Sequence, residues 1–160
     1  MATWLLCSIV PAHADFFIDQ SHRITENHPR LSYGISVADL DKDGLNEFIV
    51  TGFGYPNLAL SYKNGTLSNR DIDEIFADEN RKTIGVAACD VDGDGFEEVY
   101  FLNTDSYSGD KVLADRLLDF QTNDVDLFEI QENQSVANFT AGRSVVCVDR
   151  KGNGKFGIYV

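Results

Sequence analysis

The chain has 160 residues, a hydrophobic fraction of 43% and a formal net charge of -13. This excess of acid argues against nucleic acid or an anionic membrane surface as a partner bound through bulk charge. The apolar content suffices for one domain with a buried core, and no apolar run is long enough to span a bilayer.

The N-terminal residues have features of a secretion signal. Trp4–Val10 is a short apolar stretch, and Ala12-His13-Ala14 fits the small-residue rule at a cleavage site. A basic start is missing, so an apolar first strand packed on the core is the alternative. We predict a signal peptide at residues 1–14 and a secreted, extracellular chain from residue 15 onward.

Internal repeats organise the rest of the chain. The segment "GISVADLDKDGLNEFIVTG" aligns with "GVAACDVDGDGFEEVYFLN", and a third copy reads "SVVCVDRKGNGKFGIYV". Each copy has a short apolar segment, a glycine-containing loop and a β-branched or aromatic segment, which is typical of two strands around a loop. The repeats are placed at 33–68, 84–131 and 143–160.

Further strands are expected to complete each repeat. Asn57–Tyr62 ("NLALSY") alternates apolar and polar residues, and Asn64-Gly65 predicts a type I′ hairpin turn after it. In the second repeat, "DRLLDFQ" and "DLFEIQ" predict outer strands after a loop over 106–114. The opening "DFFIDQS" could supply one more outer strand.

Four antiparallel strands in roughly 50–60 residues match the size of one β-propeller blade. The predicted fold is therefore all-β, an incomplete β-propeller with about two and a half four-stranded blades, over residues 15–160. A closed propeller needs at least about four blades. We therefore expect the chain to be the N-terminal fragment of a longer one.

Two loops of the form D-x-D-x-D-G-x-x-E predict calcium sites. Crowded carboxylates repel one another unless a multivalent cation binds them, and Ca²⁺ prefers six to eight oxygen ligands in flexible geometry. A glycine in each loop permits the tight bend around an ion. The expected ligands are Asp39, Asp41, Asp43, the Leu45 carbonyl and Glu47 in the first loop, and Asp90, Asp92, Asp94, the Phe96 carbonyl and Glu98 in the second.

Other metal sites fit these loops less well. An EF-hand needs a bidentate Glu at position 12, where this chain has Val50 and Phe101. Magnesium demands strict octahedral geometry, and zinc would call for His or Cys ligands inside the loops. Ca²⁺ is therefore the expected cofactor.

The third loop departs from the pattern. It keeps Asp149 and Asn153 but has Lys151 and Gly157 where carboxylates are expected. Either Asp149 and Asn153 contribute to a weak metal site, or the Lys151 ammonium takes the place of the ion beside Asp149.

Cysteines and sequons agree with an oxidising, secretory route. Cys89 and Cys147 each precede an aspartate-containing loop, in separate repeats. They could form a disulfide or remain two buried free thiols. Three N-glycosylation sequons begin at Asn64, Asn133 and Asn138. Asn64 lies in the predicted turn and is the best placed for exposure.

The acidic loop between two strands resembles the FG-GAP repeats of integrin α-subunit propellers. "LSYGISVADLDKDG", "YPNLALSY" and "AGRSVVCVDRKGNGKFGIYV" resemble the N-terminal part of the cartilage acidic protein family. The resemblance implies a secreted, calcium-binding glycoprotein of the extracellular matrix or cell surface. Its calcium-stabilised FG-GAP blades would present rigid loops to extracellular proteins.

Two alternatives remain at this point: a calcium-propeller accessory domain of a secreted hydrolase, and an integrin-like adhesion module. The sequence has no G-x-S-x-G elbow, H-E-x-x-H helix or phosphate-binding loop, and its three histidines lie near the N-terminus. It also has no Arg-Gly-Asp motif. We therefore expect a non-enzymatic protein-binding module.

Overall fold

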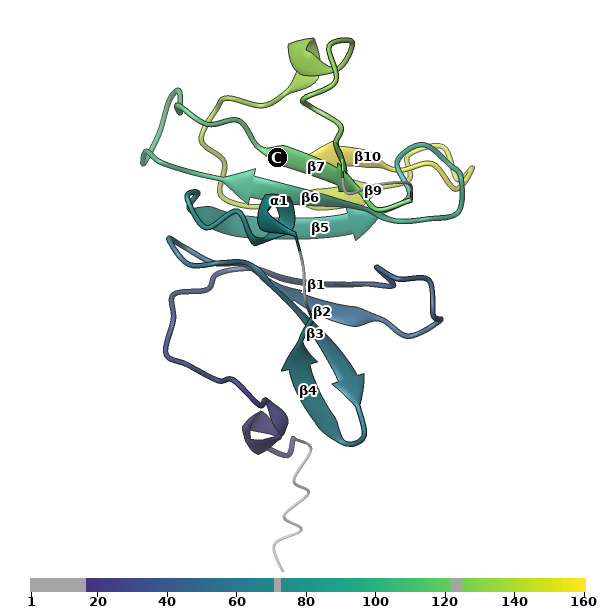
Figure 1. Ribbon diagram of the computed structural model, residues 1–160. Helices are drawn as coiled ribbons and strands as arrows, with labels where there is room; N and C mark the ends of the chain where they lie inside the picture. The colour runs from purple at the N-terminus through teal and green to yellow at the C-terminus, as the bar shows by residue number, and fades with distance from the viewer. Residues whose placement is uncertain (1–16, 71–72, 122–124) are drawn as a thin grey trace, which may run out of the picture.

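The computed structural model describes residues 17–70, 73–121 and 125–160, which form two four-stranded antiparallel sheets and a two-stranded hairpin (Figure 1). Within each sheet, each strand pairs with the next one in sequence. The first sheet contains β1 (Ile35–Ala38), β2 (Glu47–Val50), β3 (Leu58–Lys63) and β4 (Thr66–Asn69). The second contains β5 (Thr83–Cys89), β6 (Glu98–Asn103), β7 (Arg116–Asp119) and β8 (Val125–Asp126), and the hairpin contains β9 (Val146–Val148) and β10 (Gly157–Tyr159). The all-β prediction of two blades and part of a third is confirmed; the predicted signal peptide lies outside the described residues.

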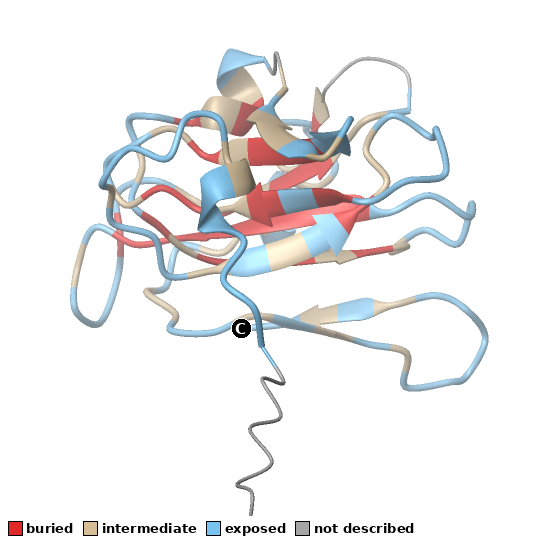
Figure 2. Ribbon diagram, turned by 90° about the horizontal axis from the view of Figure 1, so that it is seen from below, coloured by how far each residue is buried: buried red, intermediate tan, exposed pale blue. Residues whose placement is uncertain are grey.

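The second sheet is packed on both faces, which explains the unbroken apolar character of β6. Every residue of β6 is buried. One face contributes Val99 and Phe101 to a core shared with the first sheet, and the other contributes Tyr100 and Leu102 to a core shared with the hairpin. Figure 2 shows this burial in red, concentrated on the strands, while the connecting loops are exposed. A strand covered on both sides loses the alternation expected of a half-buried strand.

Among the described residues, the first sheet packs against another sheet on one face only. The side chains of Ile35, Val37 and Phe48 point away from the second sheet and are 65%, 45% and 38% exposed. Ile49 and Ala59, which face the second sheet, are fully buried. The alternation in β2 is therefore the sequence signature of a sheet with one packed face.

The innermost strands approach one another closely at two glycines. β1 lies against β5, and β5 lies against β9. A Cβ atom at Gly34 would stand 3.0 Å from the Cα of Gly85, and a Cβ at Gly85 would stand 3.3 Å from Leu102 and Val145 side-chain carbons. Glycine is required here by space and not by backbone conformation.

Cys89 and Cys147 form a disulfide that joins the end of β5 to β9, across a sequence separation of 58 residues. Of the two alternatives left open by the sequence, the structure therefore has the bonded pair. Cys89 lies just before the second loop and Cys147 just before the third, so the bond joins two neighbouring loops at their bases.

In the described part of the chain, three short helical segments lie outside the sheets: η1 (Ser21–Arg23), α1 (Glu74–Ala77) and η2 (Gln134–Val136). The outer strand expected in "DFFIDQS" is wrong for its described part, because the chain from residue 17 leads into η1. The Asp19 carboxylate accepts the backbone N–H of Ser21 at 2.8 Å and so favours a turn. α1 inserts the buried Phe76 edge-on against Phe101, with ring centroids 5.2 Å apart.

The predicted turn at Asn64-Gly65 and the predicted loop over 106–114 are confirmed, whereas the last outer strand is shorter than predicted. Asn64 and Gly65 have φ values of 53° and 87°, as the type I′ turn requires, and the 106–114 segment contains no strand. The outer strand predicted over "DLFEIQ" is wrong beyond Asp126. The Asp126 carboxylate accepts N–H groups from Leu117 at 3.2 Å and from Phe128 at 3.0 Å, which turns the chain away from the sheet.

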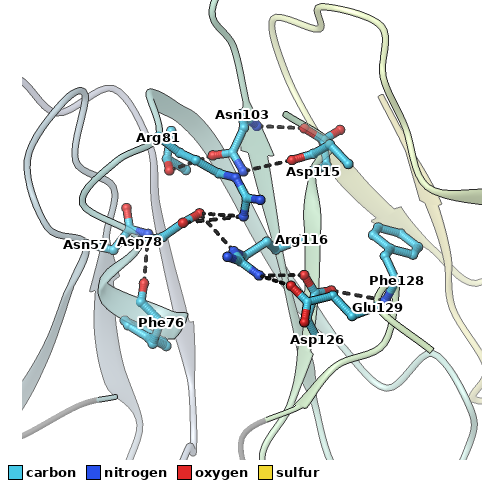
Figure 3. Close-up of polar contacts among 12 residues, drawn as sticks. Asn57, Phe76, Asp78, Arg81, Asn103, Asp115, Arg116, Asp126, Phe128 and Glu129 are labelled. Atoms are coloured by element: carbon cyan, nitrogen blue, oxygen red, sulfur yellow. Dashed lines mark hydrogen bonds and ion pairs between the residues drawn. The ribbon is translucent and has the colours of Figure 1, made fainter. Parts of the chain in front are cut away.

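An ion-pair network connects the segment between the two sheets to the second sheet (Figure 3). Arg116 on β7 lies 3.1 Å from Asp78, which follows α1, and 2.8 Å from Asp126 on β8. It also reaches Glu129 at 3.2 Å. Asp78 in turn pairs with Arg81 at 3.3 Å. The segment between the sheets is therefore held against the outer strands of the second sheet.

A second polar network is centred on Asp115, which is 1% exposed. Its carboxylate accepts hydrogen bonds from the Tyr100 hydroxyl at 2.6 Å and from the Asn103 backbone N–H at 2.7 Å. The Asn138 side-chain amide donates to it at 2.6 Å, and the ammonium of the fully buried Lys111 side chain pairs with it. Burial and the Asp115 charge raise the pKa of Tyr100 above its ordinary value, so the hydroxyl remains a donor.

Candidate metal centres

Three loops gather at one end of the sheets, between β1 and β2, β5 and β6, and β9 and β10 (Figure 1). The Lys42 ammonium of the first loop lies 3.2 Å from the centre of the Phe96 ring in the second loop. The Lys155 ammonium of the third loop contacts the Asp92 carbonyl of the second. The three loops therefore lie side by side, with Lys42 joining the first to the second and Lys155 joining the third to the second.

Each of the first two loops brings three aspartates together. Carboxylate oxygens of Asp39, Asp41 and Asp43 lie within 4.8 Å of one another, and those of Asp90, Asp92 and Asp94 do the same. The first aspartate of each set is partly buried and the other two are exposed. The structure therefore assembles the aspartates that the sequence predicted as ligands.

Backbone hydrogen bonds shape both loops in the same way. In the second loop, Asp90 accepts N–H groups from Asp94 at 3.1 Å and Gly95 at 2.9 Å, and Asp94 accepts from Phe96 at 2.8 Å. The first loop repeats these bonds at the matching positions, with distances of 3.1, 2.9 and 2.9 Å. The first aspartate is thus a structural centre as well as a candidate ligand.

Glycine is needed where the loop reverses. Gly44 and Gly95 have φ values of 85° and 91°, a region that residues with a Cβ atom adopt at a cost. They supply the N–H groups bound by Asp39 and Asp90. The curl that converges the carboxylates therefore depends on these two positions.

The two predicted glutamate ligands lie at the bases of the loops and outside the three-aspartate groups. Glu47 and Glu98 are each 2% exposed and accept the backbone N–H of Leu40 at 3.0 Å and of Val91 at 2.7 Å. Their binding to a metal stays a prediction. So does that of the Leu45 and Phe96 carbonyls, whose residues are fixed through their N–H groups.

The charge on Glu98 is poorly compensated by the protein. Burial raises its pKa to about 7, although the hydrogen bond from Val91 opposes this change. The carboxylates of Asp92, Asp119 and Asp94 raise it further. Among the described residues, no lysine or arginine pairs with Glu98, so its ionised form lacks a positive partner.

The third loop keeps the shape of the others without their charge. Asp149 accepts N–H groups from Lys151 at 3.0 Å, Gly152 at 2.7 Å and Gly154 at 2.8 Å, and the bond from Gly154 is the main cause that lowers its pKa. Asn153 accepts the Lys155 N–H at 3.3 Å. Within the described ranges no ion pair joins the Lys151 ammonium to Asp149, and it is Lys155 that reaches another loop.

The donor set of the first two loops suits a hard divalent cation. Each loop offers three carboxylates on a preformed backbone turn and a fourth, buried carboxylate at its base. Oxygen-only donors in an irregular turn match the flexible coordination of Ca²⁺ better than the octahedral demands of Mg²⁺. The residues present therefore fit calcium.

Arg70 is a member of the first site that the motif did not reveal. Its guanidinium lies 3.2 Å from Asp41 and 3.3 Å from Glu47. Arg70 follows β4, far from the loop in sequence. Its position beside the loop depends on how β4 is paired in the sheet. The sequence pattern does not determine the register of an outer strand, so this contact could not be predicted.

The three sequons differ in the environment of their asparagine side chains. Asn64 is exposed in its turn, and no hydrogen bond of the described residues engages its side chain. The Asn133 amide donates to the Leu127 carbonyl at 3.0 Å. The Asn138 amide donates to Asp115 at 2.6 Å and to the Thr140 carbonyl at 3.0 Å, so both of its hydrogens are engaged.

We expect a glycan at Asn64 and none at Asn138 when the chain passes through a secretory pathway. A glycan on the Asn138 nitrogen would leave one N–H for two acceptors, one of them the buried Asp115. Peptide mass spectrometry after enzymatic deglycosylation measures each site. Asn64→Gln should remove the mass of one glycan from the secreted chain, and Thr140→Ala should leave the glycan mass unchanged. A glycan found on Asn138 would contradict the expectation.

Comparison with known proteins agrees with this arrangement of strands and acidic loops. A family model described as FG-GAP-like repeat matches residues 28–101. The chain is 43% identical over 146 residues to cartilage acidic protein 1 of Xenopus tropicalis and of Homo sapiens, and 42% identical to that of Mus musculus. Over most of its length, the chain is therefore similar to one segment of cartilage acidic protein 1.

The similarity concerns one segment of these relatives. The aligned residues make up 84% of this chain but 23% of the Xenopus protein and 22% of the human one. The comparison therefore concerns a propeller segment and not the relatives' whole length. In the described part of the chain, no helix has the length and apolar character needed to cross a bilayer.

Proposed function

We propose that the chain is a secreted, calcium-binding glycoprotein segment of the extracellular matrix or cell surface, whose blades serve protein–protein interaction and not catalysis. The observation that carries this proposal is the pair of matching loops, each with three carboxylates within 4.8 Å. The relatives' name, cartilage acidic protein 1, agrees with an acidic extracellular protein. The disulfide agrees with an oxidising compartment.

The aspartates of each loop would hold the calcium ion. Asp39 and Asp90 fix the turn through backbone hydrogen bonds, which leaves the exposed carboxylates of the second and third aspartates facing the same point. Bound calcium supplies positive charge that offsets the mutual repulsion of these carboxylates. A loop held in one conformation presents a constant surface to a protein partner at little ordering cost.

Calorimetric titration of the chain with CaCl₂ tests the proposal. We expect two calcium ions per chain, because two loops have the complete aspartate set. The Asp92→Asn/Asp94→Asn variant should bind one ion, since an amide keeps the backbone hydrogen bonds and removes the charge. Glu97→Gln, which changes the exposed neighbour of Glu98, should still bind two ions. A titration without heat or bound calcium at millimolar concentration would refute the proposal.

A further inference from the structure

The two calcium loops differ in the charges that surround them. In the first loop, the Arg70 guanidinium bridges two expected ligands, at 3.2 Å from Asp41 and 3.3 Å from Glu47. Its side chain is 26% exposed, so it is largely enclosed by its neighbours. A cation of the chain itself therefore already stands at the first site.

The second sheet has an apolar residue where the first has Arg70. The backbone N–H of Arg70 donates to the Ala59 carbonyl at 2.8 Å, and that of Leu127 donates to the Leu117 carbonyl at 2.7 Å. The register makes these positions equivalent, with Phe48 opposite Leu60 in the first sheet and Val99 opposite Leu118 in the second. Leu127 packs into the core shared with the hairpin and brings no charge to the second loop.

A second difference between equivalent positions also makes the surroundings of the second loop more negative than those of the first. One position further along this register, Ser61 stands opposite Glu47 and Asp119 stands opposite Glu98. The Ser61 hydroxyl donates to Glu47 at 3.0 Å. Asp119 instead adds a negative charge beside Glu98, which no described cation pairs with. At these two positions the first site thus has a positive charge and a neutral donor, and the second has a leucine and a carboxylate. The Lys155 ammonium near the second loop contacts the Asp92 backbone carbonyl, and among the described residues it forms no ion pair with a carboxylate of that loop.

We infer that the two loops bind calcium with unequal affinity: the second loop is the tight site, and Arg70 makes the first a weaker one. This inference rests on the proposed calcium function. A divalent ion entering the first loop must displace or repel the guanidinium, whereas one entering the second meets an additional carboxylate. The second loop fills first, and the first loop fills only toward the millimolar calcium of extracellular fluid.

Calorimetric titration with CaCl₂ alone, with one loop silenced at a time, tests the inference. Asp92→Asn/Asp94→Asn isolates the first loop, and Asp41→Asn/Asp43→Asn isolates the second. We expect the second loop to bind about tenfold more tightly, the effect of one screened charge a few ångströms away. In the chain with the second loop silenced, Arg70→Leu should tighten the first loop about tenfold.

Controls separate local charge from folding and from net charge. Lys82→Leu removes the same charge just before β5, at the opposite end of that strand from the second loop, and should leave affinity within about twofold. Ser61→Asp gives the first loop the acid of the second and should tighten it even if Arg70→Leu fails to fold. Equal affinities of the two isolated loops, or no change with either variant, would overturn the inference and leave the calcium function intact. An absence of binding in the unmodified chain would instead remove the proposed function itself.

Discussion

Replacing Cys89 and Cys147 together by alanine is expected to lower the free energy of unfolding by about 4 kcal/mol. The bond closes a loop across 58 residues of sequence. In the chain-entropy description, a cross-link over about that length destabilises the unfolded ensemble by ~4 kcal/mol. Urea unfolding followed by circular dichroism measures the change in midpoint and slope.

Reduction provides the matched control for this prediction. Dithiothreitol should bring the unmodified chain to the stability of the double alanine variant and should leave that variant unchanged. Non-reducing peptide mapping should recover the peptides of Cys89 and Cys147 as one linked species. Two separate, alkylatable thiols in the folded protein would show that the disulfide assignment is wrong.

Asp115→Ala is expected to cost about 3–5 kcal/mol, the range for removing one partner of a buried ion pair. The substitution leaves the fully buried Lys111 ammonium without its counter-charge. It also removes the acceptor of the Tyr100 hydroxyl and of the Asn103 backbone N–H, both of which are buried. Urea unfolding of the variant measures the loss.

A double substitution distinguishes the lost pair from lost packing. Lys111→Met with Asp115→Leu removes both charges and should be less destabilising than Asp115→Ala alone, because no buried charge remains uncompensated. Glu132→Ala, at an exposed position, should change stability by no more than about 0.5 kcal/mol. An Asp115→Ala variant as stable as Glu132→Ala would contradict the role given to this network.

The strands around the acidic loops were predictable because two independent signals coincide there. Apolar runs such as Ile35–Ala38 are followed by the aspartate and glycine pattern, and this combination occurs twice in matching context. The turn at Asn64 was predictable for a similar reason, since few dipeptides adopt two positive φ angles readily. Local chemistry determines these features, so the sequence alone displays them.

Features that depend on distant parts of the chain were not predictable in the same way. The contact of Arg70 with Asp41 needs the register of three strand pairs, and the sequence left the Cys89–Cys147 bond open until β5 and β9 were placed side by side. The early end of β8 is a local effect that was missed. Asp126 satisfies two N–H groups with one carboxylate, and this competes with the strand suggested by the apolar residues after it.

The glycine contact between β1 and β5 has a consequence for the geometry of the whole assembly. Gly34 and Gly85 let these two backbones come together, with 3.0 Å between the Gly85 Cα and a Cβ built at Gly34. This tight contact limits how near β1 of the first sheet lies to β5 of the second. A methyl group at either glycine would push these two strands apart and so change the angle at which the second sheet packs on the first.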